Sequence, residues 1–178
     1  LIAVSGMEDI NVGETVTPHD HQEALPVLRI DEPTLEMTFK VNNSPFAGRE
    51  GDFVTARQIQ ERLDQQLETD VSLKVTPTES PDTWVVAGRG ELHLSILIEN
   101  MRREGFELQV SKPQVILREI DGVLSEPFER VQCEVPSENA GAVIESLGAR
   151  KGEMLDMLTT DNGLTRLIFM VPARGMIG

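Results

Sequence analysis

A strand–glycine–helix junction is the segment of this sequence whose residue types could bind a phosphate. An apolar run at residues 84–87 is followed by Gly88-Arg89-Gly90-Glu91-Leu92-His93-Leu94, which predicts a short buried strand, a turn and a helix with an acid in its first turn. The dinucleotide-binding pattern G-x-G-x-x-G needs a third glycine where His93 stands, and the chain has no G-x-x-x-x-G-K-[ST] pattern. Gly88 and Gly90 are therefore predicted to shape a structural turn.

Three further groups of residues have side chains that could do chemistry. Glu91 and His93 could form an acid–base pair, but no nucleophile or metal-ligand spacing surrounds them, and a single histidine on an apolar helix is typical of packing. His19-Asp20-His21 offers two imidazoles without a third ligand nearby, which favours a solvated linker over a metal site. Asp161-Asn162-Gly163 lacks the remaining positions of a calcium loop and predicts a hairpin turn. The sequence predicts no catalytic, cofactor-binding or metal-binding residue.

Basic side chains are the remaining candidates for binding. Arg150 and Lys151 follow a predicted helix and precede a strand, so they could stabilise the helix dipole by about 0.3–1 kcal/mol or reach a phosphate backbone, and both interpretations stay open. Arg102-Arg103 end another helix, where the dipole interpretation is favoured. Arg89 is expected to point outward at a neighbouring domain or RNA, and Arg174 is a further candidate for such a contact.

Composition limits the class of protein. The 178 residues carry a net charge of −14, which argues against a general nucleic-acid clamp, so any polyanion contact would use local basic loops. No apolar run approaches the roughly 20 residues of a membrane span. A single cysteine, Cys133, excludes a disulfide framework within the chain and suits a reducing cytoplasm. Its place in an alternating strand predicts a small core residue.

Hydrophobic periodicity predicts two similar units. In the first, Thr55 and Gln58 form a capping-box pattern at the start of a helix, and a second helix after Gly90 ends at Gly105. Alternating or buried strands are predicted at residues 34–41, 71–75, 84–87 and 106–110. The resulting order is β-α-β-β-α-β, the split arrangement of a ferredoxin-like sandwich.

The second unit repeats the first four elements of that order. Strands are predicted at residues 128–135, 154–158 and 164–171, with a helix beginning at an N-cap on Ser137. A last helix and strand are missing, and short strands at residues 1–6 and 12–16 have no predicted partner. The chain is therefore expected to be a piece of a larger protein.

Several segments resemble the translational GTPases of the elongation factor G type. Domain III of that family resembles residues 87–94, 106–113 and 118–119, and its domain V resembles residues 126–129, 135–136, 141–144, 147–152 and 169–178. The loop at residues 41–51 narrows the resemblance to one branch of the family. Residues 2–10 resemble the end of the domain II β-barrel of that branch. The resemblance covers essentially the whole chain.

The resemblance implies a GTPase that binds the ribosome between its subunits, through ribosomal RNA and protein. It also implies links to large-subunit assembly, cold growth, stress responses, tRNA binding and virulence regulation, in the cytoplasm and without a membrane partner. GTP and magnesium would belong to an N-terminal domain absent from this chain, so this segment is expected to be no enzyme. Its further partners would be the protein's own GTPase and C-terminal domains.

The expected fold class is α+β, with two ferredoxin-like units in tandem, the second truncated, after a β-barrel remnant. The expected domains are residues 1–24 for the end of domain II and a linker, 25–112 for domain III and 113–178 for domain V. Three other functions are weighed besides a ribosome-facing segment. A ferredoxin-like small-molecule regulatory module stays an alternative, whereas an RNA-recognition domain lacks its aromatic strand motif. An enzyme using Glu91 and His93 would need turnover that His93→Ala abolishes, and none is expected.

Overall fold

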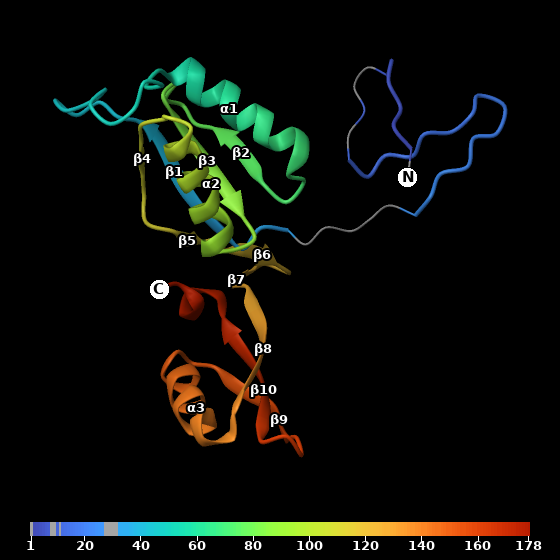
Figure 1. The fold of residues 1–178 in the computed structure, drawn as a ribbon, viewed down its shortest axis with the longest axis vertical. Coiled ribbons are helices and arrows are strands. Elements are labelled where there is room, and N and C mark those ends of the chain that lie inside the picture. The colour runs from blue at the N-terminus through green and yellow to red at the C-terminus, as the bar shows by residue number, and fades with distance from the viewer. Residues whose placement is uncertain (1, 8–9, 11, 27–31) are drawn as a thin grey trace.

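The computed structural model describes residues 2–7, 10, 12–26 and 32–178, which form two α+β units after an N-terminal segment (Figure 1). The described residues of that segment, drawn in blue, contain neither helix nor strand. The strands predicted at residues 1–6 and 12–16 are therefore wrong for the part described. A strand is stabilised by a neighbouring strand that satisfies its backbone groups, and none of the sheets formed by the described residues includes these segments. The predictions for residues 1, 8–9 and 11 lie outside the described residues.

The first unit is an antiparallel sheet covered by two helices. Its elements follow the order predicted from the sequence: β1 Leu35–Val41, α1 Ala56–Thr69, β2 Lys74–Pro77, β3 Thr83–Gly88, α2 Glu91–Arg103 and β4 Leu108–Val110. The strands pair in the order β2-β3-β1-β4, and a short strand, β5 Gln114–Val115, also pairs with β1. The central position of β1 places its alternate side chains beneath both helices.

One apolar core lies between this sheet and its helices. Alternate residues of β1 and β3 are buried on one face of the sheet, where they meet Ile59 and Leu63 of α1. Leu94, Leu97 and Met101 of α2 complete the cluster, at the helical spacing predicted from the sequence. This packing fixes the strand–helix corner at Gly88, which connects β3 to α2.

The helix boundaries of the first unit follow local signals. The predicted capping box is confirmed: Thr55 Oγ1 accepts from the Gln58 amide and Gln58 Oε1 accepts from the Thr55 amide. Gly105 adopts a φ of 93° directly after the last turn of α2. The strand predicted from residue 71 begins only at Lys74, because Asp70 Oδ1 accepts the Ser72 amide and holds a turn there.

The second unit is a three-stranded antiparallel sheet with one helix. The strands are β8 Phe128–Pro136, β9 Glu153–Thr159 and β10 Leu164–Pro172, paired in the order β8-β10-β9, and the helix is α3 Ala140–Ala149. Alternate residues of β10 form the buried core with α3, and Cys133 packs partly buried against it. The N-cap predicted at Ser137 is wrong, because a 3₁₀ turn, η1 Ser137–Asn139, precedes α3. The Ser137 hydroxyl instead donates to the Gly163 carbonyl across the unit.

A hairpin between the units was not predicted. Strands β6 Arg118–Ile120 and β7 Val123–Ser125 pair across Asp121 and Gly122, which both have positive φ, at 51° and 78°. Asp-Gly is the residue pair that favours such a two-residue turn, so the sequence did contain the signal. Arg118 donates to the Pro33 carbonyl and pairs with Glu32, which attaches the hairpin to the chain entering β1.

Candidate functional site

The glycine corner packs a strand against a helix at close range. A Cβ added at Gly88 would lie 2.9 Å from both His93 Nδ1 and Leu94 Cδ2, so the position has no room for a side chain. Gly90 differs, because a Cβ there would meet nothing within 4 Å and its φ of 179° is extended backbone open to any residue. Close packing of the strand against the helix therefore requires a glycine at position 88 and not at position 90.

His93 belongs to a hydrogen-bonded group that ties this corner to α1. Its Nδ1 accepts from the Arg89 amide at 3.3 Å, and its Nε2 lies 2.6 Å from Asp70 Oδ2. The Ser72 hydroxyl donates to the other Asp70 oxygen at 2.7 Å. Burial raises the pKa of Asp70, but the hydrogen bonds from Ser72 and His93 outweigh it and the pKa lies below its ordinary range.

Ser72, Asp70 and His93 have the residue types of a hydrolytic triad in the wrong order. In a triad the histidine stands between the nucleophile and the acid. Here the carboxylate stands in the middle, and the serine and the histidine both bond to it. The group therefore holds the end of α1 and the glycine corner together, and its order of hydrogen bonds is not the one that activates a serine.

The segment after β10 connects the two units. The Arg150 guanidinium, at the end of α3, donates to the carbonyl oxygens of Gly175 (2.8 Å) and Gly178 (3.0 Å). The Glu91 carboxylate of α2 accepts from the Gly178 amide at 2.8 Å, and Ile177 packs against the core of the first unit. This segment, which includes η2 Ala173–Met176, therefore connects the two helices. Its carbonyl oxygens bind Arg150 at the end of α3, and its Gly178 amide binds Glu91 of α2.

The predicted contact residues separate into two kinds. Arg150 and Arg174 are engaged within the chain, Arg174 through an ion pair to Glu126 at 3.1 Å. Arg89 and Lys151 are exposed, and no side-chain hydrogen bond or ion pair is formed by either among the described residues. Lys151 stands in the left-handed region, with a φ of 63°, directly after α3. Arg102-Arg103 both pair with Glu99 of their own helix.

An open groove runs between the units beside these residues. It has a volume of about 980 Å³ and is lined from residues 89–93 and 95–96 on one side and from Glu129, Arg130 and Val131 of β8 on the other. The charged side chains that line the groove include both acidic and basic residues. Among the described residues, no group of three His, Cys, Asp or Glu side chains could hold a metal ion, and no helix is long and apolar enough to cross a membrane.

A loop between β1 and α1 is built around one carboxylate. Glu107 accepts hydrogen bonds from the amides of Gly48 and Glu50, both at 3.0 Å, and from the Asn42 side chain at 2.5 Å. These bonds lower the pKa of Glu107, the backbone amide of Glu50 contributing most. Figure 1 shows the loop extending outward from the end of β1. Sequence reasoning missed this centre, because nothing local marks Glu107 as the partner of a loop about 60 residues earlier in the chain.

Comparison with known proteins identifies the fold units. Residues 53–112 match the family model of elongation factor G domain III, and residues 123–178 match that of the elongation factor G C-terminus. All 178 residues align at 75% identity with the large ribosomal subunit assembly factor BipA of Bacillus subtilis. The chain belongs to the BipA branch of the elongation factor G-like family. The resemblance noted in the sequence, including its narrowing to one branch, is confirmed.

Other BipA relatives align over the same full extent. Those of Synechocystis and Haemophilus influenzae are 56% and 52% identical to the chain over 178 residues. The chain spans 29% or 30% of the length of these curated BipA relatives. Both matched regions of elongation factor G type lie in the α+β units, and neither is a nucleotide-binding domain.

Proposed function

We propose that this chain is the non-catalytic, ribosome-facing segment of a BipA-type GTPase that takes part in assembly of the large ribosomal subunit. The observation that carries the proposal is the 75% identity, over every residue of the chain, to a protein named as a large ribosomal subunit assembly factor. The partner would be the ribosome, through its RNA and proteins. Roles in cold growth, stress responses, tRNA binding and virulence, and a cytoplasmic location, belong to the same proposal.

GTP hydrolysis in this proposal takes place outside the chain. GTP and magnesium would be held by an N-terminal GTPase domain, since the glycine corner here lacks a phosphate-binding pattern and the described residues offer no metal-binding group. The first unit would couple that domain to the second unit. The segment at residues 173–178 supports this role, because Arg150 and Glu91 attach it to both units.

Both units are proposed to be ferredoxin-like. The first unit supports this through its β-α-β-β-α-β order and its antiparallel strand order β2-β3-β1-β4, with both helices on one face. The second supports it through β8, α3, β9 and β10, which repeat the first four elements in the corresponding strand order β9-β10-β8. The proposed domain limits remain 1–24, 25–112 and 113–178.

Arg89 and Lys151 are the proposed ribosome or interdomain contacts, because both are exposed and free of side-chain partners among the described residues. Arg150 and Arg174 are proposed to position the adjoining backbone. Each phosphate contact made by a cation releases about one counterion, so its loss reduces the salt dependence of binding by roughly one unit of slope.

Binding of the chain to purified large ribosomal subunits across a salt series tests the proposal. Arg89→Glu and Lys151→Glu are expected to weaken binding and to flatten the dependence of log K on log salt. Lys74→Glu, at an exposed lysine on β2, is the matched charge-reversal control and should leave both quantities unchanged. Equal behaviour of all three variants would exclude Arg89 and Lys151 as contacts, whereas no binding by the unaltered chain would reject the ribosome-facing role for this segment.

A further inference from the structure

The loop at residues 42–51 is held in one shape from both of its ends. At its centre, Glu107 accepts from the Gly48 and Glu50 amides and from Asn42. Where the chain returns, the Phe53 amide donates to the Gly105 carbonyl and the Glu107 amide donates to the Phe53 carbonyl, both at 3.1 Å. The Phe53 ring packs on Phe106 at a centroid distance of 4.9 Å. An exposed loop with this many internal bonds loses little conformational entropy when it binds a partner.

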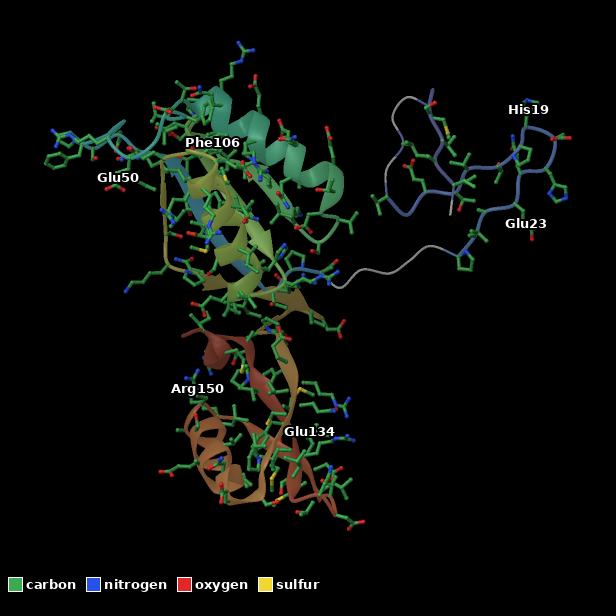
Figure 2. The ribbon with its side chains drawn as sticks, in the orientation of Figure 1. His19, Glu23, Glu50, Phe106, Glu134 and Arg150 are labelled. Atoms are coloured by element: carbon green, nitrogen blue, oxygen red, sulfur yellow. The ribbon has the colours of Figure 1, made fainter. Side chains whose placement is uncertain are left out.

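The middle of this loop, residues 46–49 (the tip), exposes an aromatic ring and a guanidinium together. Phe46 is 63% exposed, and the guanidinium carbon of Arg49 lies 4.8 Å from the centre of its ring. Figure 2 shows that side chains of the loop reach outward, away from the sheet beneath α1, with Glu50 on the inner part of the loop. Neither Phe46 nor Arg49 contributes to the core, so the fold does not explain their placement at the tip.

We propose that Phe46 and Arg49 form a stacking site for an unpaired base of ribosomal RNA, an inference that rests on the proposed ribosome-facing role. An exposed ring takes a base on its open face, while an adjacent guanidinium adds a cation and N–H donors for the neighbouring phosphate. Base stacking is compatible with the chain's net charge of −14, because the contact between ring and base does not require a positively charged protein surface. Glu50 and Asp52, one and three residues after Arg49 in the chain, carry negative charges that would repel a longer phosphate chain, so the site accommodates one or two nucleotides.

A photo-cross-linker at the tip identifies the partner directly. The chain with benzoylphenylalanine at position 46 is irradiated on purified large ribosomal subunits, and the cross-linked material is separated into RNA and protein. Cross-links to ribosomal RNA are expected, at a nucleotide outside a duplex. Cross-links to ribosomal protein alone, or to duplex RNA alone, would overturn the proposal.

Affinity measurements on the same subunits test the chemistry. Phe46→Ala should weaken binding roughly 5- to 100-fold without changing the salt slope, Phe46→Tyr should bind like the unaltered chain, and Arg49→Gln should lower the salt slope by about one. Glu107→Gln leaves Phe46 and Arg49 unchanged but should also weaken binding, because the loop would lose the carboxylate that accepts the Gly48 and Glu50 amides. Phe128→Ala removes another exposed phenylalanine, on β8, and is the matched control.

The outcomes separate this inference from the proposed function. If the unaltered chain binds subunits and Phe46→Ala binds equally well, the stacking site is rejected while the ribosome-facing role stands. If the unaltered chain does not bind, both are rejected. The melting temperatures of the Phe46 and Arg49 variants should equal that of the unaltered chain, since both side chains are outside the core.

Discussion

Nε2 of His93 lies 2.6 Å from Oδ2 of Asp70, and this hydrogen bond joins the first turn of α2 to the C-cap residue of α1. Because Nδ1 of the same ring accepts from the Arg89 amide, the proton resides on Nε2 and is donated to the carboxylate. The bond thus links the glycine corner to the opposite helix. A residue pair whose types suggest acid–base chemistry serves the architecture of the first unit.

Replacing Asp70 by Ala should destabilise the first unit by about 1–3 kcal/mol, because the Ser72 hydroxyl and His93 Nε2 would lose their acceptor in a largely buried position. Urea denaturation measures the change in the free energy of unfolding. Asp20→Ala, in the exposed N-terminal segment, is the control and should have no effect. Equal unfolding free energies for the unaltered chain and Asp70→Ala would show that these hydrogen bonds add nothing.

The contribution of Asp70 should depend on pH in one direction. Its pKa is lower in the folded chain than its ordinary value of 3.8, so the folded state favours the ionised form. The stabilisation is fully present above that ordinary value and is lost as the pH falls through the lower folded-state pKa. The difference in unfolding free energy between the unaltered chain and Asp70→Asn, measured from pH 7 downward, should therefore shrink only below about pH 4–5. A difference that is constant down to pH 2 would contradict the assignment.

Gly88→Ala should destabilise the chain by about 1–3 kcal/mol, since the new methyl group would press on His93 and on the fully buried Leu94. Gly90→Ala is a matched control two residues away, where a Cβ has open space and the backbone is extended. Thermal unfolding of both variants checks the prediction. It would be refuted by a Gly88→Ala protein that melts with, or above, Gly90→Ala.

Arg150→Gln should loosen the segment at residues 173–178, because two hydrogen bonds to its carbonyl oxygens would be lost at about 0.5–1.5 kcal/mol each. Amide hydrogen exchange at Gly178, whose N–H is held by Glu91, should become faster. Lys151→Gln removes the neighbouring cation, for which the described residues show no side-chain partner, and should leave exchange unchanged. The same exchange rate in both variants would show that Arg150 does not hold the segment.

Much of the local structure could be predicted from the sequence. The order of elements in the first unit, the capping box at Thr55 and Gln58, the end of α2 at Gly105 and the alternating strands β8 and β10 all follow from patterns within a few residues. The same reasoning should have found the Asp121-Gly122 hairpin. The predicted start of β2 and the predicted N-cap of α3 were wrong. In the first case the Asp70 carboxylate accepts the Ser72 amide and forms a turn, and in the second the Ser137 hydroxyl donates to the distant Gly163 carbonyl.

The sequence by itself determined the family, the helix and strand pattern and the lack of a nucleotide-binding motif in this chain. These depend on residue identity and short spacing, which set backbone dihedral angles and the buried face of each element. Only the tertiary structure decided that Asp70 is the partner of His93, that Arg150 holds Gly175 and Gly178, and that Glu107 organises a distant loop. Those partners are 23 to 59 residues apart in the chain, and no local preference specifies which polar groups meet once the cores have packed.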